Sequence, residues 1–163
     1  MKLPAPLRRY RHSRGFGIHS PSAYAFIREV LNPARGYAYY AYPSLRRGLG
    51  CDPRLLFRMA VKTNPATFRI DGGDRAARAY VREIIGKAVS GACETDGDAD
   101  LLISLDSATN ATTRFKNAFF ADRRNPLLAR EVSARTAGHI FFSRRAAVVI
   151  DSAAPFQTFD VAF

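Results

Sequence analysis

Two strand-like segments separated by an amphipathic segment constrain the fold of this chain more than any other feature. Residues 66–70 have the length of a short β-strand, and residues 101–105 have the length and the apolar composition of a buried one. Between them, residues 75–90 place Tyr80 and Ile84 on one face of a helix. Two parallel strands need a helical crossover of this length, so the sequence predicts a strand–helix–strand unit of an α/β protein.

The same periodicities, together with helix-capping residues, predict the other elements. We expect helices at residues 20–31, 53–63 and 109–121, and strands at residues 130–135, 139–143, 146–150 and 156–163. Ser20 before Pro21 and Asp52 before Pro53 are typical of helix N-termini. Residues 91–100 are expected to form an acidic loop. The final strands follow one another without long connections, which predicts antiparallel additions at the end of the chain.

The positive charge of the chain is concentrated in its first third. The formal net charge is +11, and residues 1–59 contain 11 basic residues opposed only by Glu29 and Asp52. Such a segment attracts phosphate-rich partners or anionic membrane surfaces, and the aromatic residues that accompany the arginines are typical of RNA binding. A solvated, arginine-rich face is the alternative interpretation. We expect residues 1–63 to form a basic arm and a helical extension, and residues 64–163 to form the α/β domain, both within one compact unit.

Neither the cysteines nor the N-terminus indicates a special compartment. Cys51 and Cys93 match no zinc-binding spacing, and we expect both to be reduced and buried. Residues 1–6 lack the apolar run of a signal peptide, and no segment has the roughly 20 apolar residues of a membrane span. These observations predict a cytoplasmic protein without a membrane span.

The segment around Gly17, His19, Ser20 and Pro21 resembles the "HGxHSPF"-type leader of one bacterial family of S-adenosylmethionine-dependent methyltransferases. Residues 100–107 are similar to the central "DLVFIDG" strand of that family. Residues 138–144 and 155–163 are similar to its last two strands. The resemblance implies an α/β fold with a Rossmann-like, mostly parallel sheet and antiparallel C-terminal strands. We expect a reduced sheet, because 163 residues are few for seven strands and a leader.

The resemblance also implies where S-adenosylmethionine would bind. The corresponding turn contains Asp71, Gly72, Gly73 and Asp74, and glycines in such a turn let the backbone approach the cofactor. Asp106, at the end of the next apolar strand, corresponds to a carboxylate near the transferred methyl group. The alternative interpretation is structural, with Asp74 capping one helix and Asp106 capping another.

The cofactor segment departs from the family pattern in two respects. Arg69 stands where the family has an acidic residue, and in the simplest alignment Asp71 and Arg75 replace the two glycines of the family turn. A shifted alignment lets Gly72 and Gly73 take their place, but it misplaces the end of the strand. Residues 91–98 are too few for the further strand that carries the ribose-binding acid, followed by a helix and a second connection. Glu94 or Asp96 are the candidates to replace that acid.

These observations lead to three functional hypotheses. The first is a degenerate, non-catalytic relative of the methyltransferases that acts through a protein partner or a paralogue. The second is a minimal active methyltransferase that binds S-adenosylmethionine through residues 71–74. The third is a basic RNA-binding or ribosome-associated module that uses the arginine-rich N-terminus. His139, within a predicted strand, is interpreted as a packed histidine, and no catalytic Ser–His pair is evident from spacing.

Overall fold

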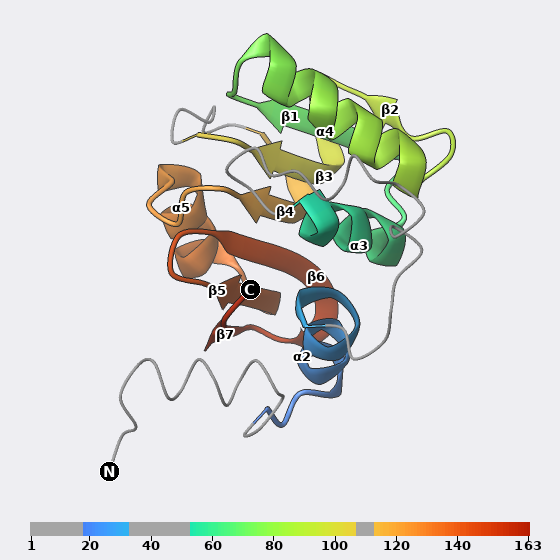
Figure 1. Cartoon of the computed structure of the whole chain (residues 1–163). Helices are drawn as coiled ribbons and strands as arrows, with labels where there is room; N and C mark the ends of the chain where they lie inside the picture. The colour runs from blue at the N-terminus through green and yellow to red at the C-terminus, as the bar shows by residue number, and fades with distance from the viewer. Residues whose placement is uncertain (1–17, 33–52, 107–112) are drawn as a thin grey trace.

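The strands form one seven-stranded sheet in the computed structural model, which describes residues 18–32, 53–106 and 113–163 (Figure 1). In chain order the strands are β1 (Thr67–Asp71), β2 (Cys93–Glu94), β3 (Ala99–Ser104), β4 (Phe115–Phe120), β5 (Ala137–Phe142), β6 (Ala147–Pro155) and β7 (Gln157–Asp160). Their order across the sheet is β2-β1-β3-β4-β6-β5-β7.

The sheet is mostly parallel, as predicted. β1 pairs in parallel with β2 and β3, and β3 pairs in parallel with β4. Antiparallel pairing is confined to the C-terminal part, where β6 runs against β4 and β5, while β7 lies parallel to β5. The α/β class is therefore confirmed. The expectation of a sheet with fewer than seven strands is wrong, because strand β2 takes only two residues of the chain.

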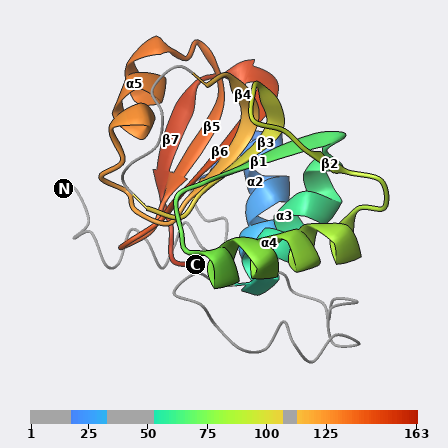
Figure 2. The ribbon, with the colours of Figure 1, turned by 90° about the horizontal axis from the view of Figure 1, so that it is seen from above.

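Helices cover both faces of this sheet (Figure 2). One face carries α2 (Pro21–Phe26), the π-helical turn η1 (Ile27–Leu31), α3 (Pro53–Thr63) and α4 (Arg75–Ala88). The other face carries α5 (Pro126–Ala134). The N-terminal helices thus pack directly on the sheet, whose strands lie between residues 67 and 160.

Alternating side chains of the central strand β3 belong to two hydrophobic clusters. Leu101 and Ile103 belong to the larger cluster, which includes the buried residues of α2, η1, α3 and α4. Leu102 belongs to the smaller cluster, together with Leu127 and Leu128 of α5. This alternation follows from the two-residue period of a strand and requires cover on both faces of the sheet.

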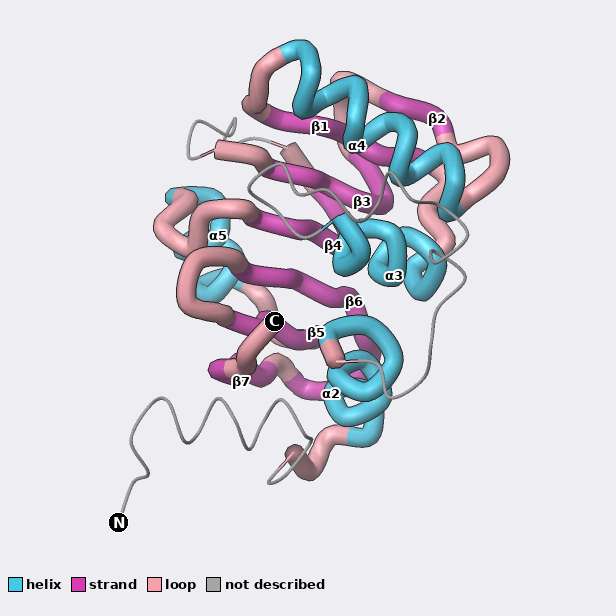
Figure 3. The backbone as a smooth tube through the Cα atoms, viewed as in Figure 1, coloured by secondary structure: helices cyan, strands magenta, loops and turns pink. Residues whose placement is uncertain are grey.

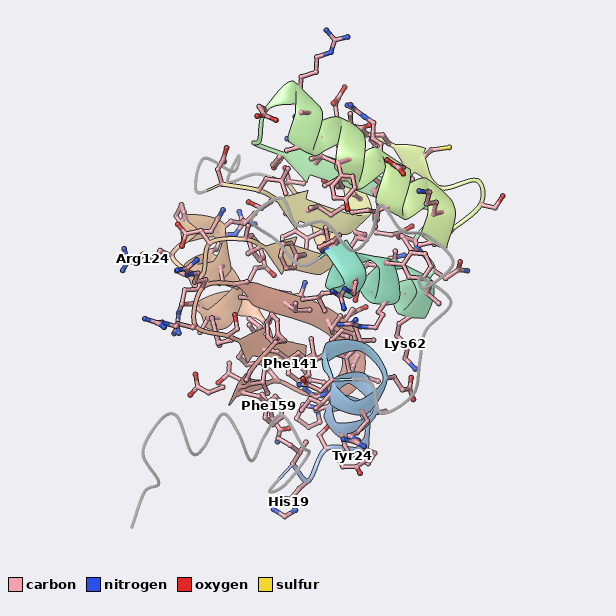
Figure 4. The ribbon with its side chains drawn as sticks, viewed as in Figure 1. His19, Tyr24, Lys62, Arg124, Phe141 and Phe159 are labelled. Atoms are coloured by element: carbon pink, nitrogen blue, oxygen red, sulfur yellow. The ribbon has the colours of Figure 1, made fainter. Side chains whose placement is uncertain are left out.

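The first described helix is held by aromatic and polar contacts. Phe26 of α2 stacks on Phe141 of β5 with ring centres 5.2 Å apart, and Phe141 stacks on Phe159 of β7 at 5.4 Å (Figure 4). The buried Arg58 of α3 donates hydrogen bonds to the carbonyl oxygens of Val30, at 2.5 Å, and Leu31, at 3.5 Å. These bonds satisfy carbonyl groups that the end of a helix leaves without partners.

Three sequence-based assignments are wrong. The helix expected at 109–121 is strand β4 over its described part, because buried residues on both faces of a strand give no alternating pattern. The strand expected at 130–135 belongs to α5, which Asn125 caps by accepting a hydrogen bond from the Leu127 amide at 2.9 Å. The segment expected to be an acidic loop, residues 91–100, contains β2 and the start of β3. The expected burial of Cys93 is also wrong, because this residue of β2 is exposed.

Some predictions lie outside the described residues. These are the basic arm up to residue 17, including Gly17 of the leader, then Cys51, the helix cap at Asp52, and residues 109–112 of the helix expected at 109–121. Within the described ranges, no helix is both long enough and apolar enough to cross a membrane.

Candidate functional site

The candidate site lies where the chain reverses its direction of progress across the sheet. After β1 the chain passes through α4 to β2 on one side of β1, and then returns to β3 on the other side. Asp71 and Ser104 end the two neighbouring strands in register, and the Leu105 amide donates to the Asp71 carbonyl at 2.9 Å. Open α/β sheets bind ligands beyond the carboxyl ends of strands at such a switch point. Figure 3 shows the loops that follow β1, β4 and β5 along this edge of the sheet.

The turn after β1 adopts a conformation that suits glycine. Gly72 and Gly73 both have φ values of +72°, in the left-handed region that other residues rarely adopt. Asp74 then caps α4 by accepting a hydrogen bond from the Ala77 amide at 2.8 Å. The structure therefore brings Asp71, Gly72, Gly73 and Asp74 to the switch point, and it gives Asp74 the structural role of a helix cap.

Asp106 lies directly against this turn. Its Oδ2 accepts a hydrogen bond from the Gly73 amide at 3.1 Å. A Cβ atom added to Gly72 would lie only 2.2 Å from Cγ of Asp106, so the carboxylate fills the space that the missing side chain leaves. The glycine that could admit a ligand to the backbone thus contacts a carboxylate of the protein itself.

A buried polar network fixes the backbone of Asp106. Ser104 Oγ donates to the Asp106 carbonyl at 2.9 Å, and Asn125 Nδ2 donates to the same carbonyl at 3.1 Å and to Ser104 Oγ at 3.0 Å. Ser104 and Asn125 are both buried. The sequence analysis missed these two residues, although Asn125 before Pro126 is a recognisable capping signal.

Arg69 lies on the other side of the switch point. Its Nε pairs with Oδ1 of Asp71 at 2.6 Å, and its Nη1 donates to the Asp96 carbonyl. Asp71 is only 8% exposed, and its Oδ2 is buried without a hydrogen-bond partner in the described part of the chain. Arg69 thus neutralises one oxygen of the buried carboxylate, and the other oxygen lacks a hydrogen bond among the described residues.

The acid at the end of β2 is already paired. Both carboxylate oxygens of Glu94 face α4, with Arg82 Nη2 at 3.0 Å and Arg78 Nη2 at 3.5 Å from Oε1. The hydrogen bond from Arg82 lowers the pKa of the Glu94 carboxyl group, and the positive charges of both arginines act in the same direction. Glu94 is therefore part of an ion-pair network between β2 and α4.

The leader residues lie away from the switch point, at the opposite edge of the sheet. Ser20 caps α2, Pro21 is its first residue, and His19 is exposed (Figure 4). Ser22 Oγ lies 2.7 Å and Ser20 Oγ lies 3.2 Å from Nε2 of His139. Ser22 and His139 line a cavity of about 320 Å³ together with eight other residues.

Among the described residues, this Ser–His contact lacks the third group that orients a catalytic histidine. His139 is fully buried, and desolvation lowers its pKa. Its Nδ1 is buried without a partner among the described residues, whereas a catalytic histidine is oriented by a group that binds its second ring nitrogen. The contact therefore serves to attach the leader to β5, and it refines the expectation of a merely packed histidine.

The described residues at the switch point do not fit S-adenosylmethionine. The buried Oδ2 of Asp71 is a suitable acceptor, but Asp106 covers Gly72, and Arg78 and Arg82 engage Glu94. In the described ranges, no group of three or more histidine, cysteine or acidic residues is arranged to hold a metal ion.

No protein-family model matches the chain, and no curated protein or solved structure is significantly similar to it. The resemblance to methyltransferases therefore rests on the motifs and remains a proposal.

Proposed function

We propose that this chain is a methyltransferase-like protein that does not catalyse methyl transfer and acts by binding, with a protein partner or a paralogue as its expected target. The sheet supports the likeness, because it is mostly parallel and its single reversed strand, β6, comes from the C-terminal part of the chain. This is the arrangement that the resemblance of the sequence motifs implies.

One observation carries the non-catalytic part of the proposal. The Asp106 carboxylate lies over Gly72 and accepts a hydrogen bond from Gly73, so the protein uses both glycines for its own packing. A cofactor that approached this turn would have to displace a carboxylate whose backbone is fixed by Ser104 and Asn125. The polar groups that would bind a ligand thus bind one another.

The contact with a protein target is expected to be polar. Among the described residues, only three large apolar side chains are exposed, namely Tyr24, Val61 and Val132, and they belong to three different helices. Isolated apolar residues of this kind are normal on a monomer and do not form a hydrophobic interface.

Calorimetry with S-adenosylmethionine and S-adenosylhomocysteine tests the proposal. Circular dichroism first establishes that each sample is folded. We expect no binding to the wild-type protein at millimolar ligand. We expect measurable binding only after Asp106→Ala, which removes the carboxylate over Gly72. Micromolar binding to the wild-type protein would refute the proposal, and so would an Asp106→Ala variant that binds no better than wild type.

A minimal active methyltransferase is the second candidate, and one specific observation favours it. The buried Oδ2 of Asp71 lacks a partner among the described residues, as an acceptor reserved for a ligand would. This hypothesis predicts micromolar binding to the wild-type protein, and it predicts that Asp71→Asn weakens that binding at least tenfold. Thr67→Ser, on the same strand but remote from its carboxyl end, is the matched control.

A further inference from the structure

A strongly basic cavity lies beside the switch point, at the carboxyl ends of β4 and β5. Two loops form it, one between β4 and α5 and the other between β5 and β6. Its volume is about 530 Å³, within the range of small-molecule sites. The residues that line it are Ala121, Asp122, Arg123, Arg124, Arg144 and Arg145.

Hydrogen bonds join the two loops that line this cavity. The Arg123 amide donates to the Arg145 carbonyl at 2.6 Å, and Arg123 Nη1 donates to the Ser143 carbonyl at 3.1 Å. The Arg123 guanidinium also lies over the ring of Phe142, 5.4 Å from the ring centre. The loops are therefore held together before any ligand binds, which lowers the entropic cost of binding.

The charge of the cavity is uncompensated. Within the part of the chain that the structure describes, no carboxylate pairs with the guanidinium groups of Arg124, Arg144 or Arg145. The single acid of the lining, Asp122, uses its Oδ1 to accept a hydrogen bond from the Arg124 amide at 2.8 Å. Arg124, Arg144 and Arg145 are exposed, and Arg124 extends away from the sheet into solvent (Figure 4).

Four arginine residues line this one cavity, and their positive charges repel one another unless an anion lies near them. Guanidinium groups bind phosphate and carboxylate oxygens in a bidentate manner, and several of them at one site favour an anion with several negative charges, such as a polyphosphate. The lining contains no aromatic residue on which a base could stack and only one apolar residue, Ala121. The chemistry of the cavity therefore suits phosphate groups and provides little recognition of a base or a sugar.

We propose that this cavity binds a ligand that carries two or more adjacent phosphate groups. Four positive charges and one negative charge match a polyphosphate better than a single phosphate. The same chemistry occurs in free polyphosphates and in the backbone of single-stranded nucleic acid. The proposal does not depend on S-adenosylmethionine binding, because the cavity shares no lining residue with the turn at residues 71–74.

Calorimetry with tripolyphosphate tests the proposal. Arg144→Glu reverses one charge of the cavity, and Arg75→Glu makes the same change in net charge at the exposed start of α4. We expect wild type to bind tripolyphosphate, Arg144→Glu to bind at least tenfold more weakly, and Arg75→Glu to stay within twofold of wild type. Circular dichroism of both variants checks that they are folded.

Two results would overturn the proposal. One is the absence of binding by the folded wild-type protein, and the other is equal weakening by Arg144→Glu and Arg75→Glu, which would indicate a non-specific effect of net charge.

A single-stranded RNA oligonucleotide without a terminal phosphate distinguishes the two sources of the ligand. If Arg144→Glu weakens its binding as strongly as that of tripolyphosphate, the cavity binds the phosphodiester backbone. If only tripolyphosphate depends on Arg144, the cavity takes a free polyphosphate or the phosphates of a nucleotide. Both results support the site. Repeating the titrations at two salt concentrations measures how many ionic contacts contribute.

Discussion

Ser22 Oγ lies 2.7 Å from Nε2 of His139, so a residue in the first described helix contacts strand β5 across 117 positions of sequence. The contact gives the leader a structural role. It joins α2 to β5 at a point where the aromatic stack of Phe26, Phe141 and Phe159 also forms. Because His139 is fully buried, its protonation is coupled to the stability of this attachment.

The first prediction is a loss of stability in mildly acidic solution. The pKa of His139 lies below its ordinary value of 6.5 in the folded protein, so the unfolded chain binds a proton first as the pH falls. The contribution of His139 is fully present above pH 6.5 and declines from there until the pH reaches the lowered pKa. Lys62 and Asp151 are the other charged residues that line the same cavity. Urea unfolding between pH 8 and pH 5 measures the effect.

His139→Gln should remove this pH dependence, and His19→Gln, which changes an exposed histidine, should retain it. The carboxyl groups of Glu94 and Asp100, whose pKa values are lowered by their basic partners, lose their contributions only below about pH 4.5, in a separate window. A flat profile for the wild-type protein between pH 7 and pH 5 would contradict the prediction.

The second prediction concerns the contact of Gly72 with Asp106. Gly72→Ala should destabilise the protein by about 2–4 kcal/mol, because it combines a left-handed backbone with a clash against the carboxylate. Gly91→Ala is the matched control, since Gly91 has a φ of +86° but open space around it, and it should cost about 1 kcal/mol.

A double-mutant cycle isolates the steric part of the Gly72 effect. In an Asp106→Ala background, Gly72→Ala should cost only about as much as Gly91→Ala does in the wild-type protein, about 1 kcal/mol. Chemical denaturation of the four proteins measures the coupling. Strictly additive effects would show that Asp106 does not occupy the space over Gly72.

Much of this site follows from the sequence, because the carboxyl ends of neighbouring parallel strands meet at one edge of a sheet. That rule brings the turn at Gly72 and Gly73 together with Asp106. The contact of Ser22 with His139 follows no local pattern. Ser104 and Asn125 also come from separate elements, and only the packed structure brings their side chains together.

The errors in the predicted fold have physical causes as well. Ala118, Phe119 and Phe120 are all buried, so β4 shows no alternation and its apolar run is compatible with a helix. Both residues of β2, Cys93 and Glu94, are exposed, so the strand has no apolar pattern at all. Asn125 before Pro126 indicates the start of helix α5, but the alternating pattern of residues 130–135 favours a strand over the same segment.

The third prediction compares two basic residues of α3. Arg58→Ala should destabilise the protein by about 2–3 kcal/mol, because it removes a buried charged donor from the carbonyl groups of Val30 and Leu31. Lys62→Ala removes only a half-exposed ion pair with Glu29 and should cost less than about 1 kcal/mol. Thermal and chemical unfolding of the two variants measure the difference. Equal losses would mean that the bonds of Arg58 do not stabilise the end of η1.

The last prediction separates the two roles of Asn125. Its Oδ1 caps α5 at the Leu127 amide, and its Nδ2 donates to Ser104 Oγ and to the Asp106 carbonyl. Asn125→Ala loses both roles and should cost about 2–3 kcal/mol, whereas Asp74→Ala loses only an exposed cap and should cost about 1 kcal/mol.

Asn125→Asp keeps the capping oxygen but replaces the buried donor with a second carboxylate oxygen, which faces the Asp106 carbonyl. The stability of Asn125→Asp should therefore be closer to that of Asn125→Ala than to that of wild type, although aspartate is as good a cap as asparagine. Chemical denaturation at pH 7 makes the comparison. If Asn125→Asp is as stable as wild type, the hydrogen bonds from Nδ2 of Asn125 to Ser104 and Asp106 contribute nothing beyond the cap.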